Sequence, residues 1–332
     1  MAFLSILIPT FNRAAKLFRL LYNIEFELSS SKIGKEQLYV LVSNNASTDS
    51  TQEVLTSFKP RNFQLKIFQQ KENIGIDSNM SFLYEQATTE YIWYFSDDDI
   101  LLPGSISTVF NCLNLYHPDA LLFSLMQPPG SRQRAFNFSE EIKVINKVSD
   151  MINLLALCPK ISIYILKKVH FSDLDYEELK RFLGTDHYFI ALSYSIIEKS
   201  MNPKLCVVSR QLVSCDSDYN KIRFSPETWG RHWVVFTHRY VNKHEPNLVQ
   251  IQKCKSYLSY ISFLWAFKVG SLDVSDPDLY EQAIKDLKIH FLWLIKEPRR
   301  VLQIILLKLH LAHLWPQVKT IFQWAKRLLK SS

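Results

Sequence analysis

Three consecutive aspartates, Asp97, Asp98 and Asp99, come at the end of the apolar run from Tyr91 to Phe95. Carboxylates held so close raise one another's pKa, and burial penalises their charged forms unless a cation neutralises them. A hard divalent ion, Mg²⁺ or Mn²⁺, is the usual solution, with phosphate oxygens and water completing its shell. The triplet therefore predicts a metal site that binds a nucleoside diphosphate. The alternative is a loop whose acids cap a helix beginning near Pro103.

The elements that position these aspartates follow a repeating pattern. Apolar runs that predict strands occupy residues 3–9, 38–43, 64–69, 90–95 and 119–125, and helical patterns at 13–28, 50–58, 78–88 and 104–116 separate them. Uninterrupted apolar strands that alternate with helices predict an α/β fold, with a mostly parallel sheet covered by helices on both faces. Ligands bind such sheets at the carboxyl ends of the strands. We therefore expect the aspartates and the polar segments after the other strands to meet in one crevice.

The pattern changes after residue 125. Residues 126–148 begin with Pro128, Pro129 and Gly130 and predict a loop or small insertion over the site. A helix is expected next at 149–157, then a strand at 161–166, a helix at 186–199 and a strand at 205–209. Beyond residue 225 the pattern is helical and rich in aromatic residues.

Composition excludes several kinds of protein. The 332 residues suit one large domain, or a catalytic domain with an appendage. With 7 glycines and no Walker or dinucleotide motif, a glycine-rich phosphate loop is not expected. Five scattered cysteines without C-x-x-C spacing argue against disulfides and zinc, and they favour a reducing cytosol. The apolar start reaches Pro9 too soon for a signal peptide or a membrane span.

The net charge of +7 is concentrated at the carboxyl end of the chain. Residues 296–332 carry eight Lys or Arg side chains and one acid, and the rest of the chain carries equal numbers of basic and acidic groups. A neutral body argues against a nucleic-acid partner. In the tail, apolar residues from Leu311 to Leu329 recur at helical spacing among the cations, which predicts a basic amphipathic helix on a membrane surface. The alternative is a helix that packs on the body.

Four segments of the first 125 residues resemble the motifs of the family 2 inverting glycosyltransferases with the GT-A fold. They occur in the family's order: Pro9-Thr10-Phe11-Asn12-Arg13, Val42 to Asp49, Asn73-Ile74-Gly75 with Asn79, and Ser96 to Asp99. Within the family the likeness is to the abequosyltransferase-like group, which builds bacterial surface polysaccharides. The resemblance implies a nucleotide-sugar-binding half at 1–125, an acceptor-binding half with the catalytic base at 126–215, and a helical C-terminal region at 216–332.

The resemblance also implies roles for the residues that match. Those expected to bind the nucleotide are Pro9, Thr10, Asn12, Arg13, Asn44, Asp97 and Asp98. Asp97 and Asp99 are expected to hold the divalent metal, Mn²⁺ or Mg²⁺, whereas Asp98 either supports them or caps a helix. The family has an aspartate where this chain has Asn44, which offers an acceptor and adds donors, so we expect an altered base preference. Asp49 is expected to cap the following helix.

An inverting transfer needs a base that takes the proton of the acceptor hydroxyl. The resemblance assigns this role to Asp186, which precedes a helical run. The family has a glutamate where Thr185 stands, and Asp186 as a helix cap is the alternative. His187 is a metal ligand, a second proton carrier or a structural residue, and Asp173 and Asp175 are expected to be loop acids.

The expected function is a metal-dependent transfer of a sugar from a nucleoside-diphosphate donor to a glycan. The acceptor is expected to be lipid-linked or a polysaccharide, in the synthesis of O-antigen or capsule. The protein would then be cytoplasmic and peripheral on the inner face of the cell membrane. Two alternatives remain: a degenerate scaffold protein with the same fold, because of Asn44 and Thr185, and a sugar nucleotidyltransferase, whose glycine- and arginine-rich loop is missing after the first strand.

Overall fold

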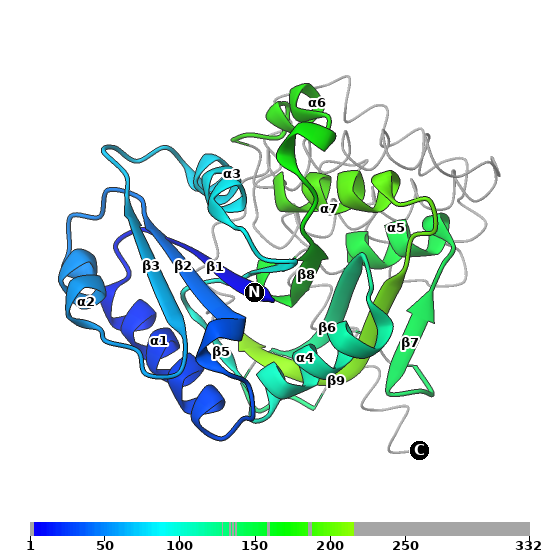
Figure 1. Ribbon diagram of the computed structural model, residues 1–332, viewed down its shortest axis with the longest axis horizontal. Coiled ribbons are helices and arrows are strands. Elements are labelled where there is room, and N and C mark those ends of the chain that lie inside the picture. Colours follow the sequence, from blue (N-terminus) through cyan, green and yellow to red (C-terminus); the bar gives the residue numbers. More distant parts are fainter. Residues whose placement is uncertain are drawn as a thin grey trace, which may run out of the picture. The chain divides into compact units, whose positions relative to one another are not determined.

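The computed structural model describes residues 3–215, apart from residues 128, 133, 135, 137, 158–159 and 185–187 (Figure 1). The predicted helical region at 216–332, with its basic amphipathic tail, lies outside the described residues. Within the described ranges, no helix is long and apolar enough to span a membrane.

A single mixed sheet of nine strands organises the described residues. The strands run in the order β3-β2-β1-β4-β8-β6-β9-β5, and β7 pairs with β9 beside this path. Their bounds are β1 Leu4–Thr10, β2 Leu38–Asn44, β3 Gln64–Gln69, β4 Tyr91–Tyr94, β5 Asp99–Leu101, β6 Ala120–Met126, β7 Ile142–Ile145, β8 Tyr164–Lys167 and β9 Leu205–Cys215.

The half of the sheet built from β1 to β4 is parallel, as the apolar pattern predicted. β1 pairs in parallel with β2 and with β4, and β2 pairs in parallel with β3. Every residue of β1 and of β4 is buried, because helices cover both faces of these strands. The register sets Thr10 beside Asn44, so the polar segments that follow these strands leave the sheet at the same edge.

Beyond β4 the sheet is mixed. β8 is antiparallel to both β4 and β6, β6 is parallel to β9, and β5 and β7 are antiparallel to β9. β5 and β7 were not predicted, since β5 has three residues and β7 buries only Ile145. β9 extends to Cys215 instead of ending at residue 209. Neither short strand has enough apolar residues to form a detectable run.

Helices cover both faces of the sheet, and those predicted from the sequence are confirmed to within a few residues. Figure 1 shows α1, α2 and α4 on one face and α3, α5 and α7 on the other. The bounds are α1 Ala14–Ser29, α2 Thr51–Ser57, α3 Ile76–Gln86, α4 Ser105–Tyr116, α5 Val148–Leu157, α6 Tyr176–Lys180 and α7 Tyr188–Lys199, with short 3₁₀ turns η1 Lys35–Gln37, η2 Ile161–Ile163 and η3 Phe171–Asp173.

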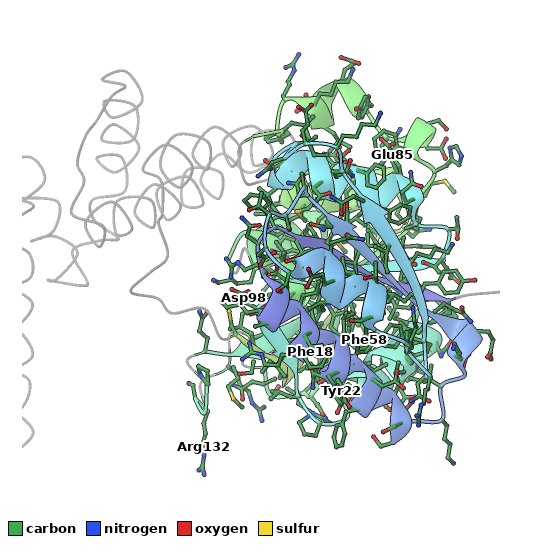
Figure 2. All side chains as sticks on the ribbon, turned by 90° about the vertical axis from the view of Figure 1, so that its left-hand side faces the viewer. Phe18, Tyr22, Phe58, Glu85, Asp98 and Arg132 are labelled. Carbon is green, nitrogen blue, oxygen red and sulfur yellow. The ribbon has the colours of Figure 1, made fainter. Side chains whose placement is uncertain are left out.

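The outer face of α1 exposes a row of aromatic side chains. Phe18, Tyr22 and Phe26 recur every four residues and are all exposed. The rings of Phe18 and Tyr22 lie 5.5 Å apart, and they contact the ring of Phe58 at 6.4 and 6.3 Å. Figure 2 shows Phe18, Tyr22 and Phe58 together on this side of the molecule. The apolar side chains on the opposite face of α1 are buried.

A buried carboxylate on α1 caps the start of α4. Glu27 Oε2 accepts a hydrogen bond of 3.0 Å from the backbone N–H of Ser105, the first residue of α4. A helix N-terminus has free N–H groups and a partial positive charge, so a carboxylate suits it. Burial nevertheless raises the pKa of Glu27, more than the backbone N–H groups of Ser105, Gly104 and Ile106 lower it.

We expect Glu27→Ala to lower the free energy of unfolding by about 1–3 kcal/mol, because the buried start of α4 loses a hydrogen-bond acceptor. Glu27→Gln keeps an oxygen at this position and is expected to cost less. The folded pKa of Glu27 lies above its unfolded value, so the wild-type carboxyl stabilises the fold most at low pH, and this contribution is lost as pH rises through the folded pKa.

Urea unfolding of the three proteins from about pH 4 to about pH 8 measures both effects. Since the amide of the Glu27→Gln variant carries no ionisable proton, the stability of the wild type relative to this variant is expected to fall as pH rises. If the free energies of unfolding of the wild type and of Glu27→Gln change with pH in parallel, burial does not raise the pKa of Glu27.

Candidate active site

A cleft of about 400 Å³ lies where β1, β2, β3 and β4 end. Its volume falls within the range of about 300–1,000 Å³ that is typical of small-ligand sites. The lining residues come from the segments after these four strands, from the start of α3 and from η2: Pro9, Thr10, Phe11, Arg13, Asn45, Asn73, Gly75, Ile76, Asn79, Ser96, Asp97 and Ile161. The structure thus brings the polar segments together in one crevice.

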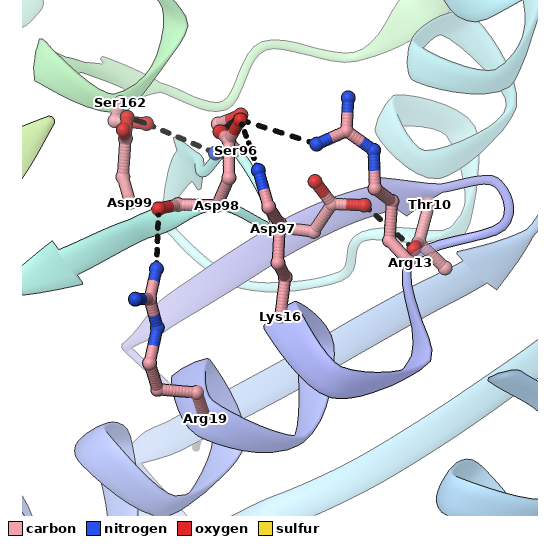
Figure 3. Close-up of polar contacts among 9 residues, drawn as sticks. All are labelled: Thr10, Arg13, Lys16, Arg19, Ser96, Asp97, Asp98, Asp99 and Ser162. Carbon is pink, nitrogen blue, oxygen red and sulfur yellow. Dashed lines mark hydrogen bonds and ion pairs between the residues drawn. The ribbon is translucent and has the colours of Figure 1, made fainter. Parts of the chain in front are cut away.

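Asp97 forms part of the cleft wall and is 7% exposed. It accepts a hydrogen bond of 2.7 Å from Thr10 Oγ1, as Figure 3 shows. Burial raises the pKa of Asp97 to about 6, and Asp98 adds to the rise, although Thr10 and Arg13 oppose it. A cation bound beside Asp97 would favour its charged form.

Asp98 is bound by cations from the start of α1 and does not line the cleft. Its Oδ2 lies 3.3 Å from Arg13 Nη1 and 3.5 Å from Lys16 Nζ, and its Oδ1 accepts a hydrogen bond of 2.6 Å from Ser96 Oγ. Arg19 donates to its backbone carbonyl at 2.9 Å (Figure 3). Burial alone would raise the pKa of Asp98, but Ser96 and the two cations together lower it. Asp98 therefore ties the aspartate segment to α1 in its charged form.

Asp99 begins β5 and is 5% exposed. Its Oδ2 accepts a hydrogen bond of 2.6 Å from Ser162 Oγ (Figure 3), whereas no nitrogen or oxygen donor of the described residues reaches its buried Oδ1. Burial raises the pKa of Asp99 to about 6, and Asp98 adds to this rise, while Ser162 and the weak thiol donor of Cys215 oppose it. Ser162 belongs to η2, beside the cleft residue Ile161, and no pattern in the sequence singled it out.

The chemistry of Asp97 and Asp99 suits a divalent metal ion, although Asp99 is not among the lining residues of the cleft. Both carboxyls are buried, both have a raised pKa, and one oxygen of Asp99 has no nitrogen or oxygen donor among the described residues. In the same part of the chain, no three His, Cys, Asp or Glu side chains cluster as a ready-made metal site. A cation held by these two carboxylates would therefore take its other ligands from phosphate oxygens and water, as Mg²⁺ commonly does.

Asn44 is the last residue of β2 and is not among the lining residues of the cleft. It is completely buried, and its Nδ2 donates to Gln52 Oε1 at 3.0 Å and to Gln69 Oε1 at 2.8 Å. Its Oδ1 accepts from the backbone N–H of Ser47 at 3.1 Å. In this structure the amide of Asn44 therefore holds the loop after β2 to α2 and β3.

Asn12 shapes the same loop from the other side. Its Oδ1 accepts a hydrogen bond of 2.7 Å from the backbone N–H of Thr48, and it does not line the cleft. Asp49 accepts hydrogen bonds from the backbone N–H of Thr51 at 3.0 Å and of Ala14 at 3.2 Å, so it binds the first N–H groups of α2 and α1. The capping role predicted for Asp49 is confirmed.

Three asparagines line the cleft although no individual role was predicted for them. Asn45 follows β2, Asn73 follows β3, and Asn79 lies on α3. Asn79 is 1% exposed, donates to the carbonyl of Ser43 at 3.1 Å, and keeps an Oδ1 with no hydrogen-bonding partner among the described residues. For Asn45 and Asn73 the available signal was their position in polar segments after parallel strands, and for Asn79 it was its place in one of the four motifs.

The predicted base Asp186 lies outside the described residues, as do Thr185 and His187. Of the rival acids, Asp175 accepts a hydrogen bond of 3.0 Å from the backbone N–H of Glu178 and caps α6. Asp173 is exposed in η3. Both are loop acids, as expected.

The fold is that of the GT-A glycosyltransferases. The structure is similar to TarS 1–349 of S. aureus in complex with UDP-GlcNAc, with a TM-score of 0.62 and 16% identity, over 86% of this chain and 79% of that one. It is similar also to a longer form of S. aureus TarS, with a TM-score of 0.62 and 15% identity, over 82% of this chain but only 46% of that one. At these identities the likeness establishes the fold alone.

Residues 5–179 match the model of glycosyl transferase family 2, which is more than half of the 332 residues. The chain therefore belongs to glycosyl transferase family 2 and is a glycosyltransferase.

Two relatives share 27% identity with this chain. One is the abequosyltransferase RfbV of Salmonella typhimurium, aligned over 65% of this chain and 67% of its own length. The other is the GalNAc(5)-diNAcBac-PP-undecaprenol beta-1,3-glucosyltransferase of Campylobacter jejuni, aligned over 40% of this chain and 42% of its own.

The loop after β2 contains a strained position that can be tested. Ala46 adopts a φ of 58°, in the left-handed region that glycine tolerates better. We expect Ala46→Gly to raise the free energy of unfolding by about 0.5–1 kcal/mol, because the loss of strain exceeds the added entropy of the unfolded chain. Thermal or urea unfolding measures the change.

Ala15, exposed in the first turn of α1, provides the matched control. Ala15→Gly is expected to destabilise, since glycine has a low helix propensity. If both variants lose stability equally, the left-handed conformation of Ala46 is not a source of strain.

Proposed function

We propose that this glycosyltransferase moves a sugar from a nucleoside-diphosphate donor to a glycan acceptor, with inversion, in the synthesis of a bacterial surface polysaccharide such as O-antigen or capsule. The observation that carries the proposal is the cleft in which Asp97, Thr10 and Arg13 meet at the ends of parallel strands. Buried carboxyls with a raised pKa at such a place indicate a functional site. The names of the two relatives support a bacterial surface polysaccharide as the class of product.

The charges along the cleft favour one orientation of the donor. Asp97 follows β4, whereas Asn45 follows β2, and β1 lies between these strands. Adjacent strands are about 4.8 Å apart, so roughly 10 Å separates the acidic end of the cleft from its amide-lined end. A diphosphate with its metal suits the acidic end, and the uncharged base suits the amides. Phe11, 40% exposed in the lining, offers an apolar surface between them.

Asp97 and Asp99 would hold the metal, Mn²⁺ or Mg²⁺. When bound, the ion would stabilise the negative charge of the departing nucleoside diphosphate. The hydroxyls of Thr10 and Ser162 orient the two carboxylates, through hydrogen bonds of 2.7 and 2.6 Å. Arg13, whose side chain is 43% exposed in the lining, presents further guanidinium N–H donors to phosphate oxygens.

We propose Asp186 as the base that removes the proton from the acceptor hydroxyl. The support comes from α7, whose first residue, Tyr188, donates a hydrogen bond of 3.0 Å to Ser81 on α3. The first residues of α3 line the cleft. This bond anchors the start of α7 to a helix of the site, and Asp186 comes two residues before that start in the sequence.

The acceptor proposed here is a lipid-linked glycan or a growing polysaccharide at the cytoplasmic face of the cell membrane. The name of the Campylobacter relative specifies an undecaprenol-linked acceptor for that protein. The eight basic side chains between residues 296 and 332, set among apolar residues, support membrane contact through an amphipathic helix. Recruitment to the membrane would bring the cleft to such an acceptor.

A thermal-shift screen of nucleoside diphosphates with and without Mn²⁺ tests donor and metal binding. We expect at least one nucleoside diphosphate to stabilise the protein by about 2.7 kcal/mol at a hundredfold excess over its dissociation constant. The part of this effect that depends on Mn²⁺ is expected to disappear in Asp99→Ala. Glu53→Gln, an exposed change on α2, serves as the control. The metal site is wrong if Asp99→Ala responds to Mn²⁺ as the wild type does.

Asp186→Asn is expected to abolish sugar transfer and to leave the binding of the nucleoside diphosphate unchanged, because the amide cannot accept the proton. The measurements are transfer from a radiolabelled donor and the dissociation constant of the nucleoside diphosphate. Asp175→Asn, at the cap of α6, is the control. Transfer by Asp186→Asn at the wild-type rate would remove this residue from the mechanism.

A further inference from the structure

Phe18, Tyr22 and Phe26 on α1 form, together with Phe58, a continuous aromatic face. The three residues of α1 are 47, 61 and 69% exposed, in that order, and side chains four residues apart lie on the same side of a helix. Phe58 extends the face through its ring contacts with Phe18 and Tyr22 (Figure 2). Single apolar side chains on a surface need no explanation, but a contiguous apolar patch marks a contact site.

The loop at residues 58–62 places cations beside the aromatic face. Lys59 and Arg61 are both exposed. The loop is fixed to α1, because Glu25 Oε1 accepts a hydrogen bond of 3.1 Å from the backbone N–H of Arg61. The same carboxylate also accepts one of 2.7 Å from the side-chain amide of Asn62. The acid of α1 on this side is thus occupied by N–H groups of the loop.

The turn after α1 adds two more cations. Lys35 Nζ donates a hydrogen bond of 3.2 Å to the carbonyl of Pro60, so this turn lies beside the same loop. Residues 32–36 and 58–62 together contain one acid, Glu36, and four cations, which we call the basic rim: Lys32, Lys35, Lys59 and Arg61. The charge of the rim is complementary to a surface of phosphate groups.

The area of the aromatic face is too small for a stable dimer. An aromatic side chain has about 150–250 Å² of surface, so the three exposed residues of α1 offer roughly 250–450 Å². A specific protein interface buries about 800 Å² on each partner. A bilayer sets no such requirement, because each ring can enter it separately. Aromatic side chains next to Lys and Arg are typical of surfaces that lie in the membrane interface.

We propose that the aromatic face is a membrane-contact surface, in which Phe18, Tyr22 and Phe26 enter the interfacial region of an anionic bilayer and the basic rim contacts the phosphate groups of its lipids. This surface lies on the catalytic domain itself and is additional to the contact proposed for the C-terminal tail. Its purpose rests on the proposed function, in which the acceptor is a lipid-linked glycan.

The position of α1 explains how such a contact serves the cleft. α1 begins at Ala14, directly after the cleft residue Arg13, and it covers one face of the sheet (Figure 1). Its outer face is therefore about one helix diameter, 10–12 Å, from the strands whose ends form the cleft. A bilayer held against the aromatic face would keep the cleft close to the lipid headgroups, where a lipid-linked acceptor presents its sugar.

The test uses the full chain and vesicles of phosphatidylglycerol and phosphatidylethanolamine in equal parts, without donor or acceptor. Tyr22→Ser/Phe26→Ser removes the two most exposed rings, and serine has a helix propensity similar to that of Tyr and Phe. We expect this variant to partition into the vesicles at least about tenfold more weakly in co-sedimentation, because the burial of two rings is lost. The loss would show beside any contribution of the tail, since separate contacts add in free energy.

Val144→Ser/Met201→Ser is the matched control. It removes two exposed apolar side chains, 38 and 96% exposed, from β7 and from the bend after α7, and it is expected to leave partitioning unchanged. Lys59→Gln/Arg61→Gln is expected to weaken binding to the anionic vesicles and to leave binding to phosphatidylcholine vesicles unchanged, because only the former attract the basic rim.

Three results would overturn the proposal. The first is a wild type that does not bind the vesicles, or that binds them no better than Tyr22→Ser/Phe26→Ser does. The second is a wild-type dimer in sedimentation that this variant dissociates, since a second copy then occupies the face. The third is a thermal melt of this variant far below that of the control, since the chain itself then covers the rings. None of these measurements uses a nucleotide, so a failure of the proposed function in the thermal-shift screen is a separate result.

Discussion

The site depends on the burial of two carboxyl groups, Asp97 and Asp99, at the end of a central parallel strand. Burial raises the pKa of both to about 6, so their charged forms are less favourable in the folded protein than in water, and a bound cation would offset this cost. The middle residue, Asp98, removes part of the repulsion because Arg13 and Lys16 neutralise it. A turn closed by the hydrogen bond from the N–H of Asp99 to the carbonyl of Ser96 separates the three side chains. The triplet thereby divides into one carboxylate paired with cations of the protein and two buried carboxyl groups with a raised pKa, to which we assign the proposed metal.

The two ends of the cleft differ in chemistry. Asp97 and Arg13 line the end near β4, whereas the end near β2 and β3 is lined by the amides of Asn45, Asn73 and Asn79. Amides satisfy one another without net charge, and their hydrogen bonds fix which atoms face outward. A ligand with a charged part and an uncharged polar part therefore has one favourable orientation, and the nucleotide sugar proposed as the donor is such a ligand.

The antiparallel strands of the second half complete the acidic end. β8 inserts between β4 and β6, and the η2 turn that precedes it brings Ser162 to Asp99. Ser162 Oγ also accepts a hydrogen bond of 2.9 Å from the backbone N–H of Ser96. The carbonyl of Ser162 accepts one of 2.8 Å from the indole N–H of Trp93. One residue from a different part of the chain thus supports both the triplet and the buried strand before it.

Local patterns in the chain were enough to predict the parallel half of the fold, the helices on its faces and the crevice at the strand ends. Apolar runs such as Leu4 to Pro9 and helical spacing are local properties, and parallel strands share one carboxyl edge. Long-range packing, by contrast, makes Asn44 hold a loop while its neighbour Asn45 lines the cleft, and it brings Ser162 to Asp99. It also creates the short strands β5 and β7, which exist through pairing with β9. These outcomes depend on contacts between residues far apart in the chain. The types of residues and their spacing do not specify which of these partners a side chain contacts.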